Sequence, residues 1–162
     1  MRLELRAPTA ADTRAIGEAL APLLAAGDAL ALTGELGAGK TTFAQGVARG
    51  LGFAGVVVSP TFTLVREYRG GRLPIVHADV YRLDRVQDVV DLALEEVAEG
   101  GVLLVEWGDA VQALLPQGHL VVELTVPGAG EDRVLALSAE GEPWALRWER
   151  LERALEPWSA AA

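Results

Sequence analysis

Residues Gly34 to Thr41 read Gly-Glu-Leu-Gly-Ala-Gly-Lys-Thr and match the phosphate-binding pattern G-x-x-x-x-G-K-S/T. Glycines let consecutive backbone N–H groups wrap around phosphate oxygens without side-chain clashes. A compact ammonium suits this chemistry, and Lys40 is the only lysine among 14 lysine and arginine residues. The octet therefore predicts a site for the phosphates of a nucleoside triphosphate.

Each polar side chain of the octet has an expected role. Lys40 can bridge the β- and γ-phosphates, the hydroxyl of Thr41 can ligate Mg2+, and Thr42 can reach the α-phosphate. The helix that starts beyond the loop adds a partial positive charge. We expect the loop itself to bind nucleotide mainly through its backbone, at Glu35, Leu36, Gly37, Ala38 and Gly39.

Two carboxylates stand where a metal-binding acid is expected. Glu106 follows a run of apolar residues, and Asp79 lies in a segment where strand alternation would put His77, Asp79 and Tyr81 on one side. Mg2+ takes protein carboxylates together with phosphate oxygens. We therefore expect Thr41 and Glu106 to hold the metal, and Asp79 or Glu106 to position the attacking water. An exposed strand end or strand face would give the same pattern.

Three further features have two readings each. Thr61, in Ser-Pro-Thr-Phe, is either a γ-phosphate sensor or part of a simple turn. Trp107 either covers the nucleotide site or fills the core, and core filling is the better expectation. Five arginines between Arg66 and Arg85 form either a positive patch or a solvated face with ordinary ion pairs.

The apolar spacing predicts alternating strands and helices in the first half of the chain. We expect an edge strand over 3–7, a helix that starts near Thr9 and buries Ile16 and Leu20, a strand over 29–32, and a helix from Lys40 that stops at Gly52. A buried strand over 56–58 should follow. The glycine-rich octet then lies between a strand and a helix, as phosphate binding requires.

In the second half, we expect strands over 63–68 and 72–80 joined by a tight turn at residues 70–71, a helix over 86–97 and a central strand over 101–106. Strands over 120–126 and 134–137 and a terminal helix over 144–155 complete the chain. These elements predict one α/β domain over residues 1–162, with the P-loop NTPase fold. Its sheet should be mainly parallel, with antiparallel strands at the margins and helices on both faces.

Composition excludes several classes of protein. The net charge is −9, which argues against holding nucleic acid through the protein's own field. The chain has no cysteine, so a disulfide framework and a thiolate metal site are impossible. We see neither a signal peptide nor an apolar run long enough to span a bilayer. We therefore expect a cytoplasmic protein that does not bind membranes.

Four segments, read together, resemble one family. They are GELGAGKTTF, SPTFTLVREY, HADVYRL and LLVEW, in this order. The combination resembles TsaE, a family of bacterial ATPases required for making threonylcarbamoyladenosine in tRNA. The resemblance covers Thr13 to about Trp107 and is looser over the last third. Glu35 stands where the family commonly has Asp, and Gly108 where Pro is frequent.

The resemblance implies a Mg2+-dependent ATPase, weak when alone, that acts in a complex with two related proteins of the TsaB and TsaD type. Those partners would transfer threonylcarbamoyl to adenosine 37 of tRNA, so the chain would meet tRNA only indirectly. ATP hydrolysis would reset the complex between turnovers. The resemblance also implies that Lys40, Thr41 and Glu106 serve nucleotide and Mg2+, and that Asp79 matters for activity.

Other family positions are matched with less defined roles. Thr61, Tyr81 and Trp107 fall on motif positions, and the resemblance places Thr13 and Arg133 near the nucleotide. The residues alone leave other functions open. A small-molecule kinase of similar size and a regulatory subunit that binds nucleotide without hydrolysing it both fit. A GTP-binding switch needs Asn-Lys-x-Asp, and the chain contains no asparagine.

Overall fold

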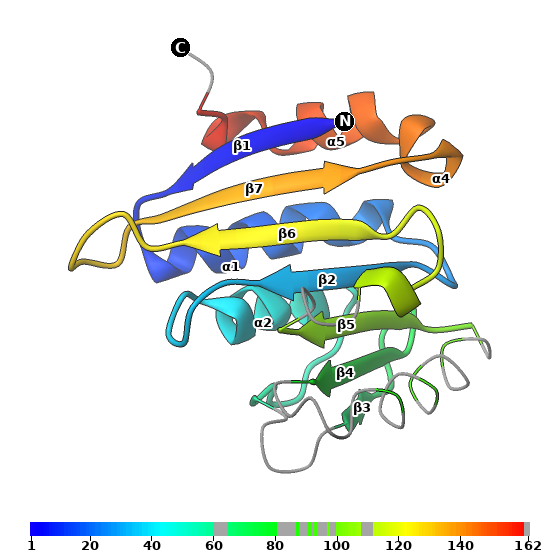
Figure 1. The fold of residues 1–162 in the computed structure, drawn as a ribbon. Coiled ribbons are helices and arrows are strands. Elements are labelled where there is room, and N and C mark those ends of the chain that lie inside the picture. Colours follow the sequence, from blue (N-terminus) through cyan, green and yellow to red (C-terminus); the bar gives the residue numbers. More distant parts are fainter. Residues whose placement is uncertain are drawn as a thin grey trace.

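Seven strands form one sheet in the order β1-β7-β6-β2-β5-β4-β3 (Figure 1). The computed structural model describes residues 1–59, 65–80, 87, 91, 93, 97, 100–107 and 112–160. The strands are β1 Arg2–Ala7, β2 Ala29–Thr33, β3 Val65–Tyr68, β4 Ile75–Asp79, β5 Val102–Glu106, β6 Leu120–Thr125 and β7 Arg133–Ala139.

The centre of the sheet is parallel and its margins are antiparallel. Strand β2 pairs in parallel with β5 and β6, and β4 pairs in parallel with β5. Strands β7 and β1 extend one side through antiparallel pairs, and β3 closes the other side in the same way. The predicted α/β class with a mixed sheet is confirmed. The carboxyl ends of the four central strands therefore lie along one edge of the sheet.

The first helix begins at a capping box. The hydroxyl of Thr9 accepts a hydrogen bond from the backbone N–H of Asp12, and the Asp12 carboxylate accepts one from the backbone N–H of Thr9. Helix α1 covers Ala10–Leu20, and the 3-10 turn η1 continues it over Ala21–Leu23. Pro22 lacks the N–H that a further α-helical turn would use. The predicted start of this helix is thus confirmed, and proline accounts for its tighter end.

Helices cover one face of the sheet, and a second buried cluster covers the other. Helices α1 and α2 (Lys40–Gly50) lie behind the sheet in Figure 1, as does α5 (Trp148–Ala154), and all three contribute to the larger core. The opposite face buries Val105 and Ala78 against the helical residues Ala93 and Val97. Most of the helix predicted over 86–97 lies outside the described residues. The sheet is therefore the middle layer of the fold.

The predicted buried strand at Val56–Val58 is wrong. These residues form no strand, and Val56 and Val58 are 81% and 42% exposed. Strand β3 occupies the place beside β4, and among the described residues the three valines pair with no strand. Val57 alone of the three is buried, and its carbonyl accepts a hydrogen bond from Gln45 Nε2.

The β3–β4 hairpin has a longer connection than the tight turn we predicted. Tyr68 pairs with Ile75, so residues 69–74 join the strands. The Arg72 N–H donates to the carbonyl of Leu51, and a Cβ on Gly71 would lie 2.4 Å from that same oxygen. The connection is therefore packed against the end of α2 instead of folding into a two-residue turn.

The predicted terminal helix over 144–155 is two short helices, α4 (Glu142–Ala145) and α5. Arg147 lies at the break, where its guanidinium donates to the carbonyls of Pro143 and Leu23 and pairs with the Asp28 carboxylate at 2.6 Å. These contacts lie outside the helix ladder and tie the C-terminal region to the start of β2. The three-turn helix expected from apolar spacing is interrupted there.

Both ends of the described chain meet at the same margin of the sheet. Strand β1 pairs with β7 along its whole length, and Leu5 also forms an antiparallel bridge with Ser159. The backbone N–H of Ala160 donates to the carbonyl of Glu4. Among the described residues, none of the helices has both the length and the apolar character to cross a bilayer.

Candidate functional site

The glycine-rich loop connects β2 to α2 at the carboxyl edge of the sheet. Gly34, Gly37 and Gly39 have φ angles of 142°, 80° and 105°, which favour glycine. Gly39 is the N-cap of α2, so the loop ends where the helix exposes its first N–H groups. A Cβ on Gly34 would lie 2.5 Å from the carbonyl oxygen of Leu124. Position 34 therefore requires glycine, both for its backbone angle and because a side chain would not fit.

Lys40 is almost fully buried, with 5% of its surface exposed. Its Nζ donates to the carbonyls of Gly34 and Glu35 at 2.7 and 2.9 Å, and it lies 3.9 Å from the centroid of the Trp107 ring. A cation over an indole face is attracted by the ring's negative quadrupole. The loop and Trp107 thus hold the ammonium at the loop.

Thr41 and Glu106 meet beside the loop. The Thr41 hydroxyl lies 3.2 Å from each carboxylate oxygen of Glu106, although 65 residues separate them in the chain. Asp79 is paired with Glu106 in the register of β4 and β5. Both acids are buried, because Glu106 is 3% exposed and Asp79 is 1% exposed. The reading of these acids as exposed strand residues is therefore excluded.

A buried histidine and a buried tyrosine extend this cluster. His77 Nε2 lies 2.6 Å from Glu106 Oε2, and His77 Nδ1 lies 3.3 Å from the hydroxyl of Tyr68. Burial is the main cause that raises the pKa of Tyr68, so its hydroxyl stays protonated at neutral pH. Strand alternation indicates His77. Tyr68 ends the quoted segment SPTFTLVREY, but no role was assigned to it, and it reaches the cluster through the pairing of β3 with β4.

Thr13 and Arg133 both lie against the loop. Thr13 is 1% exposed, its hydroxyl has no hydrogen-bond partner among the described residues, and its methyl would lie 3.7 Å from a Cβ on Gly39. Arg133 donates from Nε to the carbonyl of Ala38 at 3.1 Å and from Nη2 to that of Gly37 at 3.2 Å. The structure therefore brings these two distant residues to the octet.

Trp107 fills the core in part, as expected, and it also contacts the Lys40 ammonium. It is half-buried, packs on one side against the second core cluster, and has a φ of 64°, which is uncommon for a residue with a Cβ. It also lines a pocket of about 440 Å3 beside the loop. The other lining residues are Thr33, Gly34, Glu35, Glu123, Leu124, Thr125 and Val126.

The remaining predicted residues are placed as follows. Leu36 is 89% exposed at the tip of the loop, and Thr42 is half-buried in the first turn of α2. Thr61 and Tyr81 lie outside the described residues, as do Gly108, Arg82 and Arg85. Of the clustered arginines, Arg69 pairs with Glu67 at 2.6 Å, and Arg72 donates to the carbonyls of Ala21 and Leu24.

The donor atoms around the loop suit a hard cation that is shared with phosphate. Thr41 and Glu106 offer a hydroxyl and a carboxylate, with the Asp79 carboxylate beside them. Among the described residues, no group of three or more His, Cys, Asp or Glu could hold a metal unaided. Mg2+ usually takes one or two carboxylates and completes its shell with phosphate oxygens and water, so this donor set fits it.

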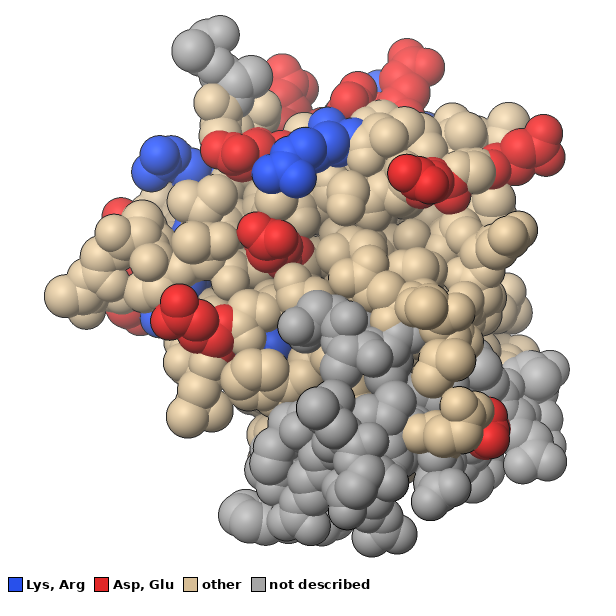
Figure 2. All heavy atoms as spheres, in the orientation of Figure 1, with Lys and Arg blue, Asp and Glu red and all other residues tan. Residues whose placement is uncertain are grey.

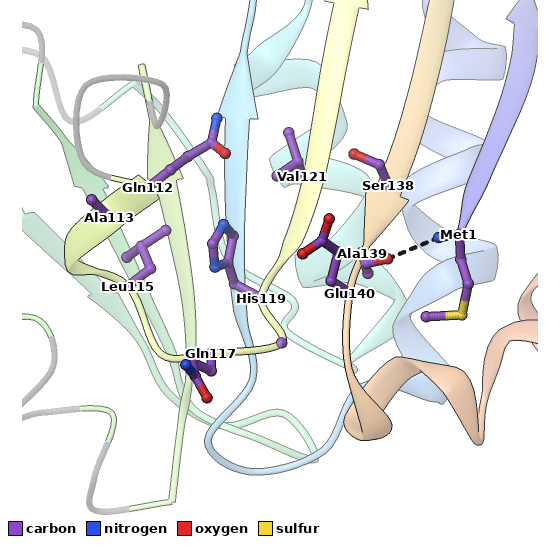
Figure 3. A pocket seen from close by; sticks show the side chains of 11 residues that line it. Met1, Gln112, Ala113, Leu115, Gln117, His119, Val121, Ser138, Ala139 and Glu140 are labelled. Carbon is purple, nitrogen blue, oxygen red and sulfur yellow. Dashed lines mark hydrogen bonds between the residues drawn. The ribbon is translucent and has the colours of Figure 1, made fainter.

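A second pocket, of about 470 Å3, lies at the opposite edge of the sheet (Figure 3). Figure 3 shows His119 and Glu140 there, near the start of β6 and the end of β7, with the Met1 amino group bonded to the carbonyl of Ala139. This pocket contains none of the predicted site residues.

On the face drawn in Figure 2, basic and acidic side chains are interspersed over the described residues, so that face offers no broad basic surface for nucleic acid.

The chain is similar to proteins named for tRNA modification. A family model described as "Threonylcarbamoyl adenosine biosynthesis protein TsaE" matches residues 7–134. The tRNA threonylcarbamoyladenosine biosynthesis protein TsaE of Bacillus subtilis (strain 168) is 42% identical over 154 residues, which cover 94% of this chain and 95% of that protein. The TsaE of Treponema pallidum (strain Nichols) is 40% identical over 127 residues, covering 78% of this chain and 93% of that protein.

A solved structure agrees with these matches. The crystal structure of Bacillus subtilis YdiB superposes with a TM-score of 0.78 at 36% sequence identity. The superposition covers 94% of this chain and 95% of that chain. The similarity thus extends through the C-terminal third, where the sequence motifs are weak.

Proposed function

The chain belongs to the TsaE family, and from this membership we propose that it is a Mg2+-dependent ATPase with the P-loop NTPase fold that serves threonylcarbamoyladenosine biosynthesis in tRNA. The observation that carries the proposal is the meeting of Thr41 with Glu106 beside a glycine loop that holds the Lys40 ammonium. This arrangement joins a phosphate-binding cation to a magnesium-binding oxygen pair.

The residues divide the chemistry among them. Backbone N–H groups at the start of α2 and the ammonium of Lys40 bind phosphate oxygens. Thr41 and Glu106 would hold Mg2+, which supplies charge neutralisation at the phosphates when bound. Asp79 accepts a hydrogen bond from the attacking water and so orients it. The hydroxyl of Thr13, which has no hydrogen-bond partner within the described part of the chain, is a further donor or acceptor at the loop.

The ATPase acts within an assembly in this proposal. The chain works with two partners of the TsaB and TsaD type, which carry out the threonylcarbamoyl transfer to adenosine 37 of tRNA in the cytoplasm. ATP hydrolysis resets the assembly between turnovers and is weak in the lone chain. The net charge of −9 supports contact with tRNA through those partners instead of directly.

Reconstitution with both partners and tRNA tests this function. We expect the partners to raise the ATPase rate, and Lys40→Ala to abolish multiple-turnover modification of tRNA because phosphate binding loses its cation. Arg49→Ala is the matched control, since Arg49 is an exposed cation in the last turn of the same helix. The measurements are phosphate release and modified adenosine formed per molecule of protein.

Full modification of tRNA by the Lys40→Ala protein would contradict the mechanism. Repeating the assay with a non-hydrolysable ATP analogue separates the alternatives. Equal modification with ATP and the analogue would assign the chain to nucleotide-dependent regulation without hydrolysis. A phosphorylated metabolite formed by the lone chain would instead indicate a small-molecule kinase.

A further inference from the structure

The carboxylate of Glu106 is held on two sides by the protein. Thr41 approaches both of its oxygens at 3.2 Å, whereas His77 Nε2 approaches Oε2 at 2.6 Å. An ionised carboxylate accepts hydrogen bonds and cannot donate them, so His77 Nε2 carries the hydrogen of this pair. The short contact therefore fixes the direction of one carboxylate oxygen.

The other nitrogen of His77 is anchored in turn. The hydroxyl of Tyr68 lies 3.3 Å from His77 Nδ1 and 3.2 Å from the carbonyl oxygen of Val58. The two rings pack with centroids 5.9 Å apart, and Phe53 packs on Tyr68 at 5.0 Å. His77 is 0% exposed and Tyr68 6% exposed. Packing and hydrogen bonding thus restrict the imidazole to one orientation.

We propose that Tyr68 and His77 are positioning residues that hold Glu106 Oε2, so that Oε1 is presented to the metal beside Thr41. The inference rests on the proposed function, because it takes Glu106 as a ligand of Mg2+. Outer-sphere partners that orient a ligating group typically change metal affinity by about 10–100-fold when removed. His77 therefore contributes to metal binding without touching the metal.

A purely structural role for His77 predicts a different pattern. If the imidazole only fills space, every polar replacement of His77 that lets the chain fold should leave the metal affinity of the protein unchanged. If the Nε2 donor matters, the metal affinity of each variant depends on where its new side chain places a donor nitrogen. A glutamine amide nitrogen reaches about as far from the backbone as histidine Nε2, whereas the asparagine amide reaches only as far as Nδ1. The pair His77→Gln and His77→Asn therefore separates donor position from polarity.

Manganese binding to the complex of the protein with ADP provides the test. Free Mn2+ is followed by its paramagnetic resonance signal, and ADP affinity is measured separately in excess chelator. We expect His77→Asn to weaken Mn2+ binding about 10–100-fold and His77→Gln to restore it to within about threefold of the wild type. Tyr68→Phe keeps the ring and should weaken Mn2+ binding several-fold. Metal-free ADP affinity should stay within about twofold in all three.

The outcomes separate this inference from the function on which it rests. A wild-type protein that binds no Mn2+ with ADP would overturn the proposed function itself. Wild-type Mn2+ binding that His77→Asn leaves unchanged would overturn only the positioning role. Equal losses in His77→Asn and His77→Gln, accompanied by weaker metal-free ADP binding, would overturn it in favour of a structural role. If His77→Asn does not fold, unchanged Mn2+ binding by Tyr68→Phe would overturn the inference.

Discussion

At the residue scale, Glu106 and Asp79 are neighbours on paired strands. Glu106 receives contacts from Thr41 and His77, which orient it toward the metal in the proposed function. Asp79 occupies the paired position on β4, so the two acids lie side by side at the same edge of the sheet. Two buried acids at one edge can therefore divide metal binding and water activation between them.

Neutralising each acid in turn tests this division. We expect Asp79→Asn to lower the rate constant of ATP hydrolysis by about 10²–10⁴-fold with little change in ATP affinity, because water orientation is lost. Glu106→Gln should mainly raise the Mg2+ concentration needed for half-maximal hydrolysis, because a metal ligand is lost. Single-turnover hydrolysis measured across a Mg2+ series distinguishes these effects. A higher Mg2+ requirement in Asp79→Asn together with a lower rate constant in Glu106→Gln would instead assign metal binding to Asp79 and water orientation to Glu106.

The sequence predicted the members of the site better than their contacts. The octet, Asp79 and Glu106 follow from spacing along the chain, and alternation along one strand pointed to His77. Tyr68 could not be predicted in this way, because its contact with His77 depends on the pairing of β3 with β4 and on packing by Phe53. Trp107 packs against the second core cluster as expected, but its contact with the Lys40 ammonium could not be predicted from its apolar character.

At the scale of elements, α1 and α2 pack through glycines. A Cβ on Gly46 would lie 2.0 Å from the carbonyl oxygen of Arg14, and a Cβ on Gly17 would lie 2.5 Å from that of Phe43. The two helix backbones therefore touch directly. This contact keeps Thr13 of α1 against Gly39 at the start of α2.

Gly46→Ala sets helix propensity against packing. Propensity alone would make alanine more stable by about 1 kcal/mol in a helix interior. The new methyl must instead displace backbone, which typically costs about 1–3 kcal/mol or more. We expect the free energy of unfolding, measured in urea, to fall by about 1–2 kcal/mol. Arg49→Ala, on the exposed side of α2, should change the free energy of unfolding by no more than about 0.5 kcal/mol. A Gly46→Ala protein that is more stable than the wild type would refute the tight contact.

Element predictions succeeded where a local signal agreed with the neighbouring structure. Thr9 and Asp12 mark the start of α1 by themselves, and the apolar runs of β2 and β5 find parallel partners. Val56 to Val58 have strand-forming side chains, but β3 occupies the place beside β4. Arg147 lies at the break between two helices and contacts residues more than 100 positions away. Such long-range effects cannot be predicted from a single segment.

At the scale of the whole molecule, Asp12 links the first helix to the C-terminal region. Its carboxylate accepts hydrogen bonds from the hydroxyl of Thr9 at 2.7 Å and from Trp158 Nε1 at 3.1 Å. The hydrogen bond from Thr9, followed by that from Trp158, lowers the pKa of Asp12 below 3.8. The hydrogen bond between Asp12 and Trp158 thus joins residues that are 146 positions apart.

This lowered pKa makes stability depend on pH in a defined direction. The unfolded chain binds a proton at Asp12 near pH 3.8, before the folded chain does. The contribution is therefore complete above that pH and is lost as the pH falls through the folded pKa. We expect Asp12→Asn to have a shallower loss of unfolding free energy below about pH 5 than the wild type. Urea denaturation across pH checks this, with Glu18→Gln as a control on the same helix, and identical slopes for wild type and Asp12→Asn would contradict it.

The pairing of β1 with β7, and of Leu5 with Ser159, has a consequence for synthesis on the ribosome. Strand β1 is made before its partner β7, because β2 to β6 lie between them in the chain. The parallel centre of the sheet likewise needs β6 beside β2. Contacts this distant in sequence slow folding, because long loops must close before the pairings stabilise them. Until β7 has been made, β1 therefore remains an unpaired strand that can associate with other chains.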